Sequence, residues 1–325
     1  AKAPLVGRWV LTLYEKGQAE QAKKARDQFR KRFGKNLQPW TFLFELYEGR
    51  RLLAAGEYDK AFDLFSKLRE NAADATSTAD ALGSAVALEL ARTVADPAGA
   101  AAYYAATTRW QQMRAAPSEE GAQLAVKMQG DFLTAHGASP FAPGVRLRLG
   151  DFQTALGSHR PAAGAYRDVL DSPQSSSAQQ QEAIWKLFQS YERLSESDES
   201  LRIARRLLTQ FPDHPKIRSA QLAIGIIYEE TGRHEEAIDD LNRVLEWAEG
   251  NDAAEARYHI GRAYEKRGDF RRAIQTYYEV SYHGKGASTN WIISADFKRA
   301  RCYEELAEPL QALSVYDKII RTAGA

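Results

Sequence analysis

One local pattern recurs along this chain: a turn residue is followed, five positions later, by an alanine. The pattern occurs six times, and in four copies an aromatic residue follows four positions after the alanine. A repeat of this size cannot bury its own apolar face, so neighbouring copies must stack on one another. The sequence therefore predicts an all-α fold, a right-handed α-solenoid of about 16–17 helices packed in pairs. The turn residues and their alanines are Gly17/Ala22, Gly56/Ala61, Gly157/Ala162, Gly232/Ala237, Gly268/Ala273 and Ala307/Ala312.

The spacing of the turn residues supports this fold. Alanine at the fifth position of a second helix lets two helices approach closely, and glycine at the turn reverses the chain without steric cost. Five equivalent turn residues are separated by 38, 37, 36 and 39 residues: Gly157, Ser195, Gly232, Gly268 and Ala307. The chain resembles the tetratricopeptide repeat (TPR) family in these residues and periods, over roughly residues 3–70 and 141–322.

The repeat pattern divides the chain into three parts. Residues 1–70 carry N-terminal TPR-like repeats, and residues 141–325 carry the C-terminal array. Residues 71–140 are rich in alanine and lack a clean match, so we expect an inserted or unpaired helix and a bend there. The last residues, IIRTAGA, follow no polar capping helix. Terminal repeats need a polar outer face, so we expect either that a partner covers this end or that the chain is a fragment of a longer one.

Charge and apolar content narrow the classes of function. The formal net charge is +1, whereas nucleic-acid-binding domains are usually strongly basic. We therefore expect no nucleic-acid partner. No run of 18 apolar residues occurs, so we expect no transmembrane segment.

The charge is nevertheless uneven along the chain. Residues 1–35 hold ten Lys or Arg against three Asp or Glu, a balance of +7. Residues 229–252 hold nine acidic against two basic residues, a balance of −7. Solvated outer helix faces would explain both regions, and the alternative is attraction between them in self-association or docking. A further alternative is binding of nucleic acid or an anionic membrane through KKARDQFRKRFGK (23–35).

No residues have the spacing of an enzyme active site or a metal site. The six histidines are scattered, and HEEA at 234–237 lacks the second histidine of a zinc-protease helix. Cys302, the single cysteine, lies in a first helix, so we expect a buried thiol and no internal disulfide. The sequence therefore predicts no catalytic residue, no metal and no cofactor. Abundant carboxylates are expected on a solvated helix face: Glu229, Glu230, Glu235 and Glu236.

The family resemblance implies which residues bind a partner. In TPR superhelices the first helix of each pair lines the concave groove, and its groove positions here lie ten, six and two residues before each turn residue. Aromatic and arginine residues in such a row suit a peptide-binding wall, and the alternative is that the aromatic side chains pack between helices. The Lys–Asn pair of the carboxylate clamp is absent, so we expect no acidic chaperone tail as partner. The predicted groove residues are Trp185, Gln189, Arg193, Tyr258, Arg262, Lys266, Phe297 and Arg301, with Leu222, Ile226, Glu230 and Glu305 at the remaining positions.

The leading functional hypothesis is a non-enzymatic scaffold for protein–protein interaction. Residues 138–215 resemble TPR modules of bacterial cell-envelope proteins, namely the outer-membrane assembly lipoprotein and the TolA-binding coordinator. That resemblance implies a bacterial multiprotein assembly and favours the periplasm over the cytoplasm. The alternative is a helical accessory domain of a cell-wall or polysaccharide-processing enzyme whose catalytic part is not in this chain.

Overall fold

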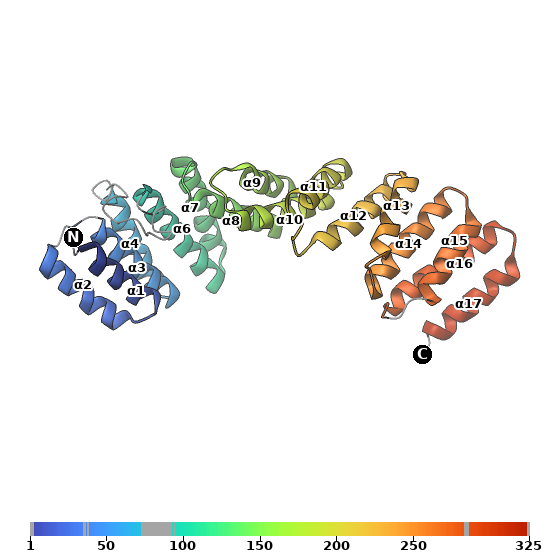
Figure 1. The fold of residues 1–325 in the computed structure, drawn as a ribbon, viewed down its shortest axis with the longest axis horizontal. Helices are drawn as coiled ribbons and strands as arrows, with labels where there is room; N and C mark the ends of the chain where they lie inside the picture. Colours follow the sequence, from blue (N-terminus) through green and yellow to red (C-terminus); the bar gives the residue numbers. More distant parts are fainter. Residues whose placement is uncertain are drawn as a thin grey trace. The chain divides into compact units, whose positions relative to one another are not determined.

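The computed structural model describes residues 3–34, 37, 39–72, 93, 95–282 and 286–323. In these ranges the chain forms sixteen α-helices and no strand (Figure 1). The prediction of an all-α chain is therefore confirmed. The helices are α1 (Ala3–Glu15), α2 (Ala19–Phe33), α3 (Trp40–Ala54), α4 (Tyr58–Glu70), α6 (Pro97–Ala115), α7 (Glu119–His136), α8 (Ala142–Ala155), α9 (His159–Asp171), α10 (Ser177–Arg193), α11 (Ser197–Gln210), α12 (Ile217–Glu230), α13 (His234–Leu245), α14 (Gly250–Lys266), α15 (Phe270–Tyr282), α16 (Thr289–Glu305) and α17 (Pro309–Ala323).

The helices pack as pairs, and the pairs pack on one another. Within a pair, α12 contacts α13, α14 contacts α15 and α16 contacts α17. Between pairs, α12 also contacts the next first helix, α14, and α14 contacts α16. This arrangement of first and second helices confirms the predicted solenoid of TPR-like helix pairs.

The chain divides into two compact units, residues 1–180 and residues 181–325. The N-terminal unit holds α1 to α9, and α10 begins in it and ends in the C-terminal unit. In the N-terminal unit, α6 packs against both α4 and α7, partly through stacking of Phe65 on Tyr104 with ring centroids 5.4 Å apart. Residues 73–92, which include most of the expected inserted helix, lie outside the described residues.

The predicted turn residues share one backbone conformation. Glycines at these positions have positive φ, and the equivalent Ser195 and Ala307 adopt the same left-handed region with φ of 56°. At Gly232 the turn closes with two hydrogen bonds, from Gly232 N to the Glu229 carbonyl (3.2 Å) and from Arg233 N to the Tyr228 carbonyl (2.8 Å). Both bonds are accepted by carbonyls in the last turn of the first helix, so they end that helix as a Schellman motif does.

The predicted alanines lie where two helices touch. All six are buried, at 0–3% exposure. A second small residue, which the sequence analysis missed, lies seven positions before the turn. At Gly261 a β-carbon would come within 2.5 Å of the Tyr277 ring, so only glycine fits beneath this aromatic side chain. The same contact joins Gly49 to Phe65, Gly150 to Tyr166 and Gly225 to Leu241.

Candidate partner-binding surface

The predicted groove residues occupy equivalent positions on three first helices of the C-terminal unit. They are spaced four residues apart, so those of one helix lie on one side of it. We call them the first-helix row: Trp185, Gln189 and Arg193 on α10, Tyr258, Arg262 and Lys266 on α14, and Phe297 and Arg301 on α16. Five of the eight are exposed, and Trp185, Tyr258 and Arg262 are partly buried.

Trp185 and Tyr258, two aromatic members of the row, are partly used in packing. The Trp185 ring lies 5.3 Å from that of Phe188 and 6.5 Å from that of His214. The Tyr258 ring lies 5.3 Å from the ring of Trp291, so it packs between α14 and α16. Both rings help to hold successive repeats together, which leaves only part of each for a partner.

Phe297 differs from the other two aromatic residues of the row. Its ring lies 6.0 Å from that of Tyr316 on α17. Its side chain is nevertheless 49% exposed, because no described helix packs over it as α16 packs over Tyr258. Phe297 is therefore the aromatic residue of the row with most surface available for contact.

The cations of the row fall into two kinds. Arg262 Nη1 lies 3.4 Å from Glu229 Oε2, and His259 Nδ1 lies 3.1 Å from the same oxygen. Glu229 is 2% exposed, so Arg262 compensates a buried carboxylate. Lys266 and Arg301 are exposed and make no ion pair within the described residues. Lys266 and Arg301 can therefore bind a partner without breaking an ion pair inside the fold. The same holds for Arg193.

The burial of Glu229 corrects one expectation from the sequence. Glu230, Glu235 and Glu236 are exposed as expected, but Glu229 faces the next first helix and not solvent. Its counterpart one repeat later, Glu265, accepts from Lys298 Nζ at 3.1 Å. One sequence pattern indicates this burial. An acidic residue lies three positions before the turn, and a basic residue lies at a matching position of the next repeat.

Glu192 on α10 is at the same repeat position but has no such base. The two positions on α12 that correspond to His259 and Arg262 of α14 are Ala223 and Ile226. Desolvation raises the pKa of Glu192 to about 6, the charge of Glu230 adds to this effect, and Arg193 opposes it. Two carboxylates therefore lie close together beside the first-helix row.

Other candidate chemistry has a structural explanation. Cys302 is 1% exposed, as expected for a small buried thiol, and its pKa is raised to about 12 by burial and by the nearby charge of Glu265. In the part of the chain that the structure describes, no three His, Cys, Asp or Glu side chains gather as a metal site. No described helix has the length and apolar character needed to cross a bilayer.

Comparison with known proteins identifies the repeats. Family models of the tetratricopeptide repeat match residues 180–250 and residues 255–282. A solved structure of MamA is 19% identical with a TM-score of 0.44, and the match covers 54% of this chain and 94% of that one. MamA from Desulfovibrio magneticus RS-1 is 13% identical with a TM-score of 0.46, covering 56% and 94%. A kinesin light chain candidate from Podosopora anserina with TPR-like repeats is 15% identical with a TM-score of 0.44, covering 55% and 93%. The family match and the helix pairs together show that the chain contains tetratricopeptide repeats in its C-terminal unit.

Proposed function

We propose that this protein is a non-enzymatic scaffold that binds a segment of a partner protein along the first-helix row. The observation that carries the proposal is that Lys266, Arg301 and Phe297 are exposed on two adjacent first helices, and that neither cation makes an ion pair with any residue that the structure describes. TPR arrays offer extended surfaces of this kind to protein partners.

The charges of the surface define the chemistry of the partner segment. Arginine and lysine at α14 and α16 suit carboxylates, and arginine can bind a carboxylate through two hydrogen bonds. Phe297 supplies apolar area for an aromatic or aliphatic anchor next to them. Glu192 and Glu230, towards α10 and α12, suit a lysine or arginine. The preferred segment is therefore acidic and apolar where it meets α14 and α16, and it carries a lysine or arginine where it meets Glu192 and Glu230, beside the exposed Arg193.

The resemblance to bacterial cell-envelope TPR modules supports a place in a bacterial multiprotein assembly, with the periplasm as the compartment. The alternative role, an accessory domain of a cell-wall or polysaccharide-processing enzyme, uses the same surface to hold a catalytic chain. Both roles require a protein segment on the first-helix row, so one experiment tests their shared basis.

The test is selection of linear peptides from a random phage-displayed library on the full chain. A parallel selection uses the double variant Lys266→Glu/Arg301→Glu, and a matched control uses Lys23→Glu/Lys24→Glu on α2, where both lysines are exposed. We expect acidic sequences with an aromatic or aliphatic residue from the wild type and the control, and loss of these sequences from the row variant. Selection of no consensus, or of the same consensus by all three proteins, would overturn the proposal.

A further inference from the structure

Arg148 on α8 is a partly buried arginine that is held in place by neutral groups. Its Nε and Nη2 donate to Gln129 Oε1 at 3.3 and 3.1 Å, and its Nη1 donates to the Tyr103 hydroxyl at 3.3 Å. The guanidinium also lies over the Tyr103 ring, 4.7 Å from its centroid. Gln129 is fully buried on α7. Among the residues that the structure describes, no carboxylate therefore balances the charge of Arg148.

The place of Arg148 in the repeat shows which partner is missing. Arg148 lies nine residues before the turn residue Gly157. The C-terminal unit has three basic residues nine positions before a turn, and each of them is bonded to a carboxylate. A carboxylate is therefore the usual partner of a base at this position. The three pairs are Lys186 with Glu182, His259 with Glu229, and Lys298 with Glu265.

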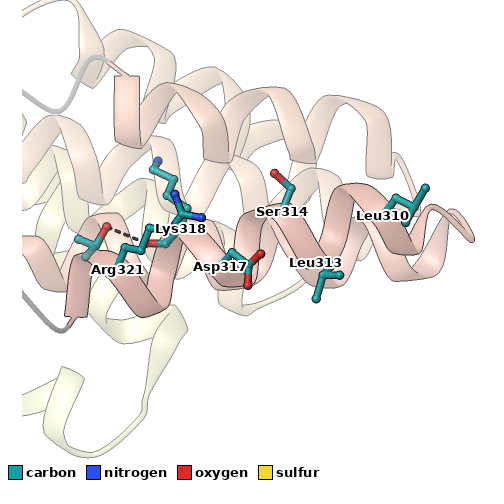
Figure 2. A pocket seen from close by; sticks show the side chains of 7 residues that line it. Leu310, Leu313, Ser314, Asp317, Lys318 and Arg321 are labelled. Atoms are coloured by element: carbon teal, nitrogen blue, oxygen red, sulfur yellow. Dashed lines mark hydrogen bonds between the residues drawn. The ribbon is translucent and has the colours of Figure 1, made fainter.

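A hollow along α17 shows how a cation beside an open surface is balanced elsewhere in this chain (Figure 2). Lys318 lines the hollow, and its Nζ lies 2.8 Å from Oδ2 of Asp296, which is 2% exposed. Lys318 thus compensates a buried carboxylate of the fold. Arg148 differs from Lys318 because its charge is left for a ligand to balance.

Two further hydrogen-bond donors lie beside Arg148. The Tyr103 hydroxyl accepts from Arg148, and its own hydrogen has no acceptor among the described residues. On α10, Gln179 Oε1 accepts from Ser176 N and Ser176 Oγ at 2.9 and 3.2 Å, which leaves Gln179 Nε2 as a donor. A β-carbon at Gly144 would lie 3.6 Å from both the Tyr103 hydroxyl and Gln179 Nε2, so the glycine leaves the space beside these donors open. Gly144 lies one turn before Arg148 on the same face of α8.

We propose that Arg148, Tyr103 and Gln179 form a carboxylate-binding site in the N-terminal unit, and that its occupant is an aspartate or glutamate side chain of a partner protein. The three bonds that hold Arg148 leave one N–H on each terminal nitrogen, and arginine binds a carboxylate through two such groups. Because Gln129 and Tyr103 already fix the guanidinium, binding costs little ordering of this side chain. The donors come from α6, α8 and α10, and TPR arrays bind protein segments across successive helices.

The test follows the Nε–H signal of Arg148 by proton–nitrogen NMR on the full chain. The signal is identified by its loss in Arg148→Lys, and it should also be the arginine signal that Tyr103→Phe shifts most. The probe is the tripeptide glycine–glutamate–glycine with an acetylated N-terminus and an amidated C-terminus, added up to about 50 mM at constant ionic strength. Parallel titrations use the same tripeptide with glutamine in place of glutamate, free glutarate, and inorganic phosphate.

We expect the glutamate tripeptide to shift the Arg148 signal with saturation at millimolar concentrations, because it offers one charged contact only. The glutamine tripeptide should require at least a tenfold higher concentration. Tyr103→Phe keeps the ring but removes a donor, so it should raise the half-saturating concentration at least threefold. Tyr58→Phe is the matched control, at another partly buried tyrosine of the N-terminal unit, and should bind as the wild type does.

Three results would overturn the proposal. The Arg148 signal could fail to saturate with the glutamate tripeptide. It could respond equally to the glutamine tripeptide or to phosphate, which would exclude selectivity for a carboxylate. Saturation by glutarate but not by the tripeptide would show that the occupant is a free small carboxylate and not a protein segment. The first-helix row lies in the C-terminal unit, so the Arg148 signal tests this site whether or not the row binds a partner.

Discussion

Two turn residues carry a side chain where the backbone favours glycine. Ser195 and Ala307 have φ of 56°, the left-handed region that Gly232 and Gly268 occupy at equivalent positions. A non-glycine residue in this region costs about 1–2 kcal/mol. The sequence pattern located these turns because it is local, and the shared conformation shows that Ser195 was aligned with the glycines correctly.

We therefore predict that Ala307→Gly stabilises the protein. The relief of left-handed strain, offset by the greater freedom of glycine in the unfolded chain, should raise the free energy of unfolding by about 0.5–1 kcal/mol. Urea unfolding followed by circular dichroism measures this change. Gly268→Ala is the reverse control and should lower the free energy by a similar amount. A destabilised Ala307→Gly variant would show that this turn is not strained.

Glu192 makes stability depend on pH. Its pKa is raised in the folded protein to about 6 from an ordinary value of 4.5. The folded state therefore holds the proton more tightly than the unfolded chain, and the ionised carboxylate lowers stability above about pH 6. This penalty builds up between about pH 4.5 and about pH 6, and it disappears below about pH 4.5, where both states become protonated.

Glu192→Gln should accordingly raise the melting temperature at about pH 7.5 and have little effect at about pH 4.5. The side chain is still exposed to water, so we expect a gain of no more than about 1 kcal/mol at the higher pH. Thermal unfolding at both pH values measures it. Glu305→Gln, at an exposed carboxylate of α16, is the control and should change little at either pH. An equal rise in melting temperature at both pH values would show that the ionised Glu192 carboxylate does not cause the loss of stability.

At the scale of the helix pair, packing depends on a glycine beneath a large side chain. We predict that Gly261→Ala lowers the free energy of unfolding by about 1–3 kcal/mol, because the new methyl group overpacks the contact with Tyr277. Gly164 on α9 is exposed and has nothing near its β-carbon, so Gly164→Ala should instead stabilise by about 0.5–1 kcal/mol. Urea unfolding measures both changes. A tolerated Gly261→Ala would mean that the two helices can move apart without cost.

The limits of sequence reasoning are clearest at this scale. The turns and repeat alanines were predictable because one repeat contains the whole pattern. The burial of Glu229 was not, because it depends on His259 and Arg262 on the next first helix, about one repeat further along the chain. The partial burial of Trp185 and Tyr258 was likewise left open, since it depends on Phe188, His214 and Trp291.

At the scale of the whole molecule, contacts within the fold and contacts with a partner use different side chains of the first helices. The first helices of the C-terminal unit contact one another through Glu229 with His259 and Arg262, through Glu265 with Lys298, and through the aromatic contact of Tyr258 with Trp291. They expose Lys266, Arg301 and Phe297. Arg262 compensates the buried Glu229, so reversing its charge would damage the fold as well as the surface. A test of binding must therefore use the two exposed cations and leave Arg262 in place.

The most direct test is isothermal titration calorimetry of the library-selected peptide with the full chain. Lys266→Glu/Arg301→Glu should raise the dissociation constant more than tenfold, which corresponds to about 1.4 kcal/mol. Its melting temperature should hardly change, because both side chains are exposed. Lys23→Glu/Lys24→Glu on α2 should bind as the wild type does. If the α2 variant lost binding and the row variant kept it, the partner would use the basic N-terminal region and the central claim would be wrong.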